Sequence, residues 1–428
     1  MKCARAIVGI FVLVLCGSPL AAQTFSSGST GADGALDLTS GDAVQTLQVP
    51  PGGVFNFTTV NIPSGRRLRF IANVSNSAVV ILATGNVTIG GEIDVRPPSQ
   101  TGLVGPHGNR ESGPGGFWGS FPGGNGFGPG GGVAPNNQGR WVGPLSLVPI
   151  VGGSGGALEN LCGSGYATGG SGGGGALAMA STTSIAVTGS ITARGNPSLC
   201  FGGTSGAGGA IRLVAPSISV SGSLNALGGD GASASNSGVV RIEANADSLQ
   251  FTGLSSPAAV LSAINPTLVL TAAPTLRIVS IAGFQVPAGS GTRPDTVDLL
   301  LPTQLVDPIP LVVQASNIPV GSQVILAING SPSATAAPAT LTGTDQSSTA
   351  TVNITGLDRT RLIFLFASIT FEVPVIAQVV NPAGPNHIAK LRIDASPGKD
   401  SQIAFLRRDG SEVATTDVPI GIRQLFGR

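Results

Sequence analysis

Short runs in which apolar and polar residues alternate recur along the first 260 residues, and glycine closes many of them. The clearest runs carry two large apolar residues separated by one small or polar residue, with glycine two positions later. They lie at 87–91, 185–189, 218–222 and 249–253. Another alternating run precedes each one, at 79–83, 176–180, 210–215 and 239–244, and a third follows three of them, at 92–95, 190–193 and 223–226. This period-2 pattern predicts units of two or three short strands.

The spacing of the units predicts how they assemble. Gly189 and Gly222 are 33 residues apart, Gly222 and Gly253 are 31 apart, and Gly91 precedes Gly189 by 98, which is one unit plus an insertion. Self-similarity at a nearly fixed period indicates stacked units that share one core. We therefore predict a parallel β-helix. The alternative is an antiparallel sandwich whose strands resemble one another only in composition.

An earlier coil is predicted from the runs at 54–57, 60–62 and 68–71, with residues 29–42 as its N-terminal cap. The cap carries Asp33, Asp37 and Asp42. Carboxylates suit calcium, but the spacing matches no twelve-residue calcium loop and Asx-turns account for the same residues. No metal site is therefore predicted.

A glycine-rich insertion spans 101–175, where 28 of 75 residues are glycine. Because it joins two stacked coils, we expect a large loop on one flank, with extended or polyproline-II-like packing as one arrangement. Both tryptophans and the single tyrosine lie in it, at Trp118, Trp141 and Tyr166. These rings either pack the insertion onto the β-helix or form a contact site for a glycan or an envelope partner.

After residue 257 the predicted strands are longer, and the frequency of glycine falls to an ordinary level. Seven runs read as strands, at 267–271, 276–280, 296–301, 311–315, 322–328, 350–354 and 362–371. Their number and spacing predict an Ig-like β-sandwich over 258–374. Residues 375–428 are predicted to form a small C-terminal β-module or a tail. The predicted fold is thus all-β throughout.

The first 22 residues combine a basic start, eleven apolar residues and a small-residue segment before Ala22. This pattern predicts a secretory signal peptide; the alternative is a short membrane anchor, although the apolar run is shorter than the roughly 20 residues of a span. We expect an exported, secreted or cell-surface protein without a transmembrane span in its mature chain. Export also favours a disulfide between the two remaining cysteines, Cys162 and Cys200.

The coils resemble those of secreted bacterial right-handed parallel β-helix proteins, the broad group that contains adhesin passenger domains and pectin-lyase-like enzymes. The glycine-flanked run at 208–215 resembles glycine-rich exported surface proteins, here followed by an Ig-like module. The resemblance covers about residues 45–255. It implies the fold, and it leaves adhesion and polysaccharide degradation both open as functions.

Candidate chemistry is sparse, because only 10% of the residues are charged and the formal net charge is +1. Such a chain lacks the basic surface of a nucleic-acid binder. Glu92 and Asp94 share one strand face and form the best carboxylate pair, of the kind that glycoside hydrolysis needs. The two histidines, His107 and His387, lie in a loop and in the other domain. We nominate no catalytic residue and predict no cofactor.

Arg66, Arg67 and Arg69 form a small basic cluster. They either bind an anionic glycan or flank a strand whose apolar residues point inward. The sequence favours an exported, non-catalytic structural or adhesion protein with an extracellular glycan or envelope surface as its partner. The alternative is a secreted β-helix enzyme that degrades polysaccharides.

Overall fold

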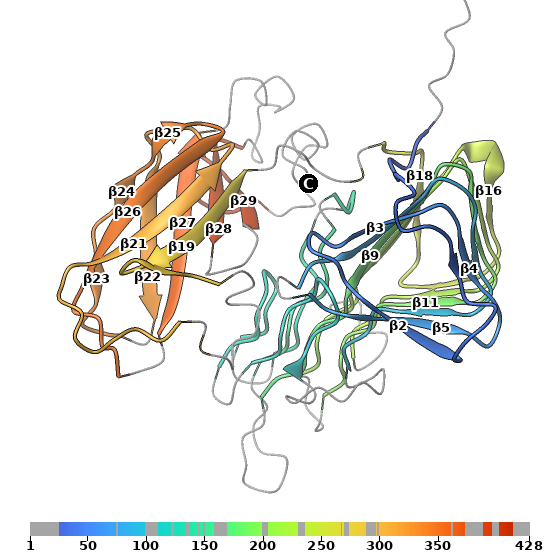
Figure 1. Ribbon diagram of the computed structural model, residues 1–428, viewed down its shortest axis with the longest axis horizontal. Coiled ribbons are helices and arrows are strands. Elements are labelled where there is room, and N and C mark those ends of the chain that lie inside the picture. Colours follow the sequence, from blue (N-terminus) through green and yellow to red (C-terminus); the bar gives the residue numbers. More distant parts are fainter. Residues whose placement is uncertain are drawn as a thin grey trace, which may run out of the picture.

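The computed structural model describes most of the chain and shows two all-β bodies, a parallel β-helix and a β-sandwich (Figure 1). The described residues are 25–73, 76–98, 110–120, 124–133, 137–143, 145–148, 150–157, 169–198, 204–229, 236–266, 268, 274–287, 297, 299–329, 331–360, 363–372, 388–395 and 402–413. The predicted signal peptide lies outside them. The all-β prediction is confirmed.

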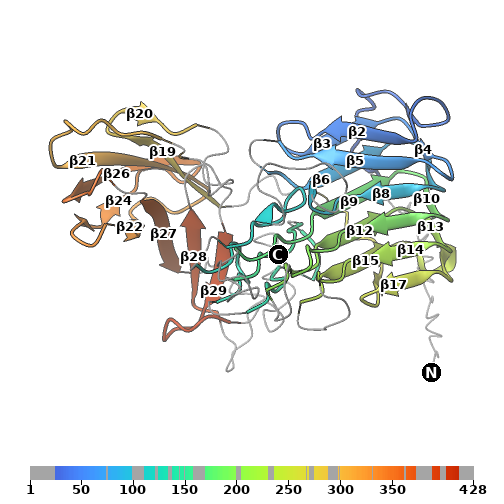
Figure 2. The same ribbon diagram turned by 90° about the horizontal axis from the view of Figure 1, so that it is seen from below.

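Three six-stranded parallel sheets form the β-helix, and each coil gives one strand to each sheet (Figure 2). Sheet A contains β1 (Leu36–Asp37), β4 (Val60–Ile62), β7 (Val87–Ile89), β10 (Ser184–Val187), β13 (Ser217–Val220) and β16 (Leu249–Phe251). Sheet B contains β2 (Val44–Gln48), β5 (Arg67–Ile71), β8 (Glu92–Asp94), β11 (Ser190–Thr192), β14 (Ser223–Asn225) and β17 (Leu254–Ser256). Sheet C contains β3 (Val54–Phe57), β6 (Val79–Ala83), β9 (Ala176–Ser181), β12 (Ala210–Val214), β15 (Val239–Glu243) and β18 (Val260–Ser262). The parallel β-helix is confirmed, including the early coil expected from residues 54–71.

Corresponding residues of successive coils stack in columns. In sheet A, Val87 pairs with Ile185, which pairs with Ile218, which pairs with Leu249. These inward columns form one continuous apolar core, and polar residues alternate with them on the outer faces of sheets A and B. Sheet C differs, because every residue of β6, β9 and β12 is buried. Its outer face is therefore covered as well.

The glycine that closes each repeat is required by the stacking. A Cβ on Gly189 would overlap the carbonyl oxygen of Gly91, and a Cβ on Gly222 would overlap that of Gly189. The corner backbones of successive coils thus approach more closely than any side chain allows. This contact explains the glycine in the sequence signature.

The glycine-rich insertion joins β8 to β9, and its described residues pack as extended segments with a three-residue period. Gly153 and Gly156 donate their N–H groups to Gly174 and Ser171 of one neighbouring segment, while Gly155, between them, donates to Phe127 of another. Neighbouring backbones are so close that a Cβ on Gly155 would overlap the carbonyl oxygen of Trp118. Three residues per turn is the period of the polyproline-II helix. The glycines therefore build a packed bundle.

Two antiparallel sheets form the second body. The first contains β20 (Phe284–Gln285), β19 (Thr275–Ile281), β21 (Ile309–Ser316), β26 (Ser347–Thr355) and β23 (Thr335–Ala336), with β25 (Thr342–Thr344) paired to β26. The second contains β24 (Ala339–Thr340), β22 (Gln323–Asn329), β27 (Phe364–Glu372), β28 (Lys390–Ala395) and β29 (Gln402–Leu406). Their inner faces share one apolar core, so a sandwich-like module follows the β-helix as predicted.

Two details of the C-terminal prediction need correction. The strands β28 and β29 extend the sheet beyond β27, so this part of the expected separate module over 375–428 belongs to the sandwich. The described residues of the predicted strand at 296–301 pair with no other strand. Val297 and Leu300 are exposed there, while Leu299 and Leu301 pack against the edge of the core.

Candidate functional site

The outer face of sheet B carries an ionic cluster, here called the sheet B network, made of Arg67, Arg69, Glu92, Asp94 and Arg96. The parallel register of β5 and β8 places Arg67 beside Glu92 and Arg69 beside Asp94. Arg67 Nε lies 2.5 Å from Glu92 Oε2, and Arg96 bridges the two carboxylates at 3.2 Å and 2.7 Å. The predicted pair of carboxylates on one face is thus present, and arginines hold both.

The charges and burial of this network shift the pKa of two of its arginines in opposite directions. The hydrogen bonds that Arg96 donates to Asp94 raise the pKa of Arg96, which fixes its guanidinium as a cation. Burial, followed by the neighbouring charge of Arg67, lowers the pKa of Arg69. Arg69 Nε lies 3.9 Å from Asp94 Oδ2 and makes no hydrogen bond. Both carboxylates thus lie in ion pairs with arginines of the same face.

Arg66 points elsewhere, although it adjoins Arg67 in sequence. Its guanidinium donates to the carbonyl oxygens of Gly41 and Thr39, at 2.5 Å and 3.2 Å. It therefore holds the N-terminal cap segment against β5. The predicted basic cluster divides into Arg66, which fixes the cap, and Arg67 and Arg69, which belong to the sheet B network. Whether any of the three binds a glycan stays a prediction.

Two of the three cap carboxylates, Asp33 and Asp37, also have protein partners. Asp37 Oδ1 accepts from the N–H of Thr39 at 3.1 Å, which is an Asx-turn, and from Asn61 Nδ2 at 3.0 Å. Asp33 Oδ2 accepts from the N–H of Asn56. In the described part of the chain, no three His, Cys, Asp or Glu side chains gather as a metal site would require.

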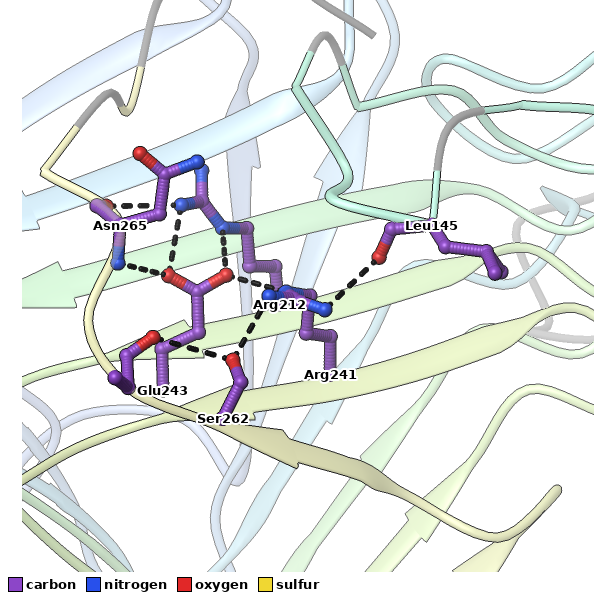
Figure 3. A network of polar contacts seen from close by, with 7 residues as sticks. Leu145, Arg212, Arg241, Glu243, Ser262 and Asn265 are labelled. Carbon is purple, nitrogen blue, oxygen red and sulfur yellow. Dashed lines mark hydrogen bonds and ion pairs between the residues drawn. The ribbon is translucent and has the colours of Figure 1, made fainter. Parts of the chain in front are cut away.

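A second ionic cluster lies on the outer face of sheet C (Figure 3). It is called the sheet C network and consists of Arg212, Arg241 and Glu243. Arg212 and Glu243 form a two-point ion pair, with distances of 3.1 Å and 3.0 Å, and both side chains are fully buried. Arg241 adds a contact of 2.5 Å to Glu243 Oε1. One buried carboxylate is thus shared by two guanidinium groups, of which Arg212 is fully buried and Arg241 is 16% exposed.

Two separate segments cover the sheet C network and hydrogen-bond to it. The insertion contributes the carbonyl oxygen of Leu145, which accepts from Arg241 at 3.3 Å. The chain that leaves β18 contributes Asn265, whose N–H donates to Glu243 Oε2 at 2.8 Å and whose carbonyl oxygen accepts from Arg212 at 3.1 Å. Figure 3 shows both arginines and the N–H of Asn265 directed at the carboxylate of Glu243, and Leu145 in contact with Arg241. The satisfied polar atoms explain how the charges tolerate burial.

The sequence prediction did not include the sheet C network, although one signal was present. Aligning the runs at 210–214 and 239–243 pairs Arg212 with Arg241 and Val214 with Glu243 on neighbouring strands. Arginine at the centre of two otherwise apolar strands, with an acid two residues from one of them, indicates a buried ion pair.

The aromatic side chains of the insertion serve packing where the structure describes them. Trp118 is only 7% exposed, so it presents no ring face to a ligand. Trp141 is half-buried, donates from Nε1 to the carbonyl oxygen of Val151 at 2.9 Å, and packs with Leu147, Ala176 and Ala210. These contacts favour the packing interpretation of both tryptophans. Tyr166, Cys162 and Cys200 lie outside the described residues, so ligand binding by Tyr166 and the disulfide stay predictions.

Comparisons with known proteins add no family or function to this picture. No family model matches the chain, and neither the curated proteins nor the solved structures contain a match. Among the described residues, no helix has the length and apolar character needed to cross a membrane. The account of function therefore depends on the residues and contacts above.

Proposed function

We propose that this chain is an exported, non-catalytic structural or adhesion protein of the cell surface or extracellular matrix, in which the β-helix serves as a rigid stalk. One observation carries the proposal. Each acidic side chain on the described β-helix strands has a partner within the protein: Glu92, Asp94 and Glu243 pair with arginines, and Asp37 closes an Asx-turn. The acids therefore stabilise the coils.

The fold suits such a role. Each coil contacts mainly its neighbours, so stacking extends a rigid rod whose outer faces remain available to partners. The N-terminal pattern of a signal peptide supports export, and the low charge suits an extracellular glycan or envelope surface as partner. The glycine bundle adds a second rigid element at the corner between sheets B and C.

A polysaccharide-degrading enzyme is the competing proposal, because Glu92 and Asp94 share the outer face of sheet B, where Glu92 is partly exposed and Asp94 is buried. The test incubates the purified mature chain with polygalacturonate, alginate, xylan and a neutral β-glucan, and measures new reducing ends and unsaturated products. We expect no product above the level given by a Glu92→Gln, Asp94→Asn double variant. Turnover that the double variant abolishes would establish the enzyme instead.

Export and surface location need their own measurement. Cells that express the full chain are fractionated, and intact cells are treated with protease. We expect the chain outside the cytoplasm, cleaved after Ala22 and accessible to protease on intact cells. Retention of an uncleaved chain in the cytoplasm would contradict the proposal.

A further inference from the structure

After the last strand of sheet C, the chain turns back over the strands of the same sheet. The last strand of sheet C, β18, pairs with β15, and it is the final strand in the described order of that sheet. Val260 and Leu261 on β18 are 39% and 48% exposed. An edge strand at the end of a solenoid has one neighbour instead of two, so it is the first part expected to open.

Directly after β18 the chain turns back over strands that precede β18 in the sheet. The returning segment, called the strap, comprises residues 263–266 and Leu268. Its Asn265 hydrogen-bonds to Glu243 on β15 and to Arg212 on β12, which lie one and two coils before β18. The strap is thus attached to the interior of the sheet.

Apolar contacts extend this attachment. Ile264 and Leu268 pack on a strip of the outer face of sheet C formed by side chains from β6, β9 and β12. The strip consists of Val80, Leu82, Ala178, Ala180 and Val214. The strap shares this cover with Phe25 and Ile150, which pack on the same strip. Lifting the strap would therefore expose its own part of the strip, and the buried carboxylate, to water.

We propose that Glu243 is a latch that holds the strap closed over the end of the β-helix, so that the strap and the last coil open together as one unit. With the latch closed, β18 cannot separate from β15 without also detaching Asn265 from two interior strands. With the latch open, the last coil becomes an ordinary frayed edge, and the part of the apolar strip beneath Ile264 and Leu268 becomes accessible. The C-terminal end of the β-helix thus has a closed and an open state, and the carboxylate of Glu243 favours the closed state.

Hydrogen exchange of the full mature chain, read segment by segment, tests the latch. The variant Glu243→Gln keeps the shape of the side chain and removes its charge. We expect amides in β16–β18 and at Asn265 to exchange about tenfold faster or more, since they then open without the full chain unfolding. Amides in β4–β7, which lie at the other end of the β-helix, should keep the exchange rates of the unaltered protein.

A second variant separates the latch from a general loss of folding. Ile264→Ser combined with Leu268→Ser leaves the ion pair intact and removes the apolar attachment of the strap, and it should produce the same local pattern. Glu92→Gln in the sheet B network is the matched control and should leave β16–β18 unchanged. The proposal would be overturned if the amide exchange of the last coil stayed unchanged both in Glu243→Gln and in the Ile264→Ser, Leu268→Ser variant. A loss of protection spread evenly over all six coils would overturn it too, because it would make Glu243 a general stabilising residue.

Discussion

The two ionic networks of the β-helix use the same chemistry in different surroundings. In the sheet B network, the paired Arg67 and Glu92 keep 37% and 20% of their side chains exposed, whereas Asp94 in the same network is buried. In the sheet C network, Arg212 and Glu243 are both fully buried beneath the insertion and the strap. The register of the coils brings the partners together in both cases. The pairs Arg67–Glu92 and Arg212–Glu243 differ in how far other segments bury them. Burial increases the loss of stability that follows when one partner of an ion pair is removed.

The largest effect is expected from breaking the buried pair. Arg212→Met leaves the Glu243 carboxylate buried with only Arg241 as its ionic partner, and should lower the free energy of unfolding by about 3–5 kcal/mol. Urea unfolding followed by tryptophan fluorescence measures it, since both tryptophans lie in the insertion. A loss below 1 kcal/mol in Arg212→Met would mean that the buried pair contributes no more to stability than the partly exposed pair of sheet B.

A smaller effect is expected from disturbing the cover. The variant Gly155→Ala forces a methyl group against the carbonyl oxygen of Trp118 within the glycine bundle and should cost about 1–3 kcal/mol by overpacking. The control is Gly90→Ala, where the nearest atom would lie 3.1 Å from the new carbon. The same urea titration compares them. Equal stability of the two variants would mean that the bundle is not tightly packed.

The sheet B network should respond weakly and with salt. Arg67→Met removes a partly exposed ion pair and is expected to cost about 0–1 kcal/mol at low ionic strength, and less at 1 M salt because screening weakens the original pair. Unfolding titrations at both salt concentrations measure this difference. A large cost that salt does not change would show that the network behaves as a buried one.

The smallest effect concerns a carboxylate outside both networks. Asp409 in the C-terminal hairpin accepts hydrogen bonds from the hydroxyl and N–H of Ser411, which lower its pKa below the ordinary value of 3.8. Its contribution to stability is therefore present above pH 3.8 and is lost as the pH falls through the lowered value. NMR titration of Asp409 should show the pKa rising towards 3.8 in Ser411→Ala. An unchanged pKa in that variant would exclude the hydroxyl as the cause.

The sequence was sufficient for the coils because their pattern is local. Alternation fixes which residues point inward, and the closing glycine marks the corner where stacked backbones touch, so Gly189 and Gly222 could be placed in advance. The segment at 296–301 shows the limit of the same reasoning. Its apolar residues Leu299 and Leu301 do reach the core, but pairing with another strand depends on neighbours that alternation does not specify.

The functional residues were harder to predict for a related reason. On an outer face, Arg212 and Arg67 look alike in sequence, since both are arginines at outward positions of short strands. Only the insertion and the strap, which come from other parts of the chain, make Arg212 buried. The role of Trp118 depended on the same long-range packing. Residues whose surroundings come from distant segments therefore need the structure.

A pair of double-mutant cycles tests the central claim most directly, namely that cover determines the strength of the two networks. The first cycle combines Arg212→Met with Glu243→Gln, and the second combines Arg67→Met with Glu92→Gln, each measured by urea unfolding at low and high salt. The account predicts a coupling of about 2 kcal/mol or more for the first pair, unaffected by salt, and of about 1 kcal/mol or less for the second, falling with salt. Couplings of equal size and equal salt dependence would contradict it.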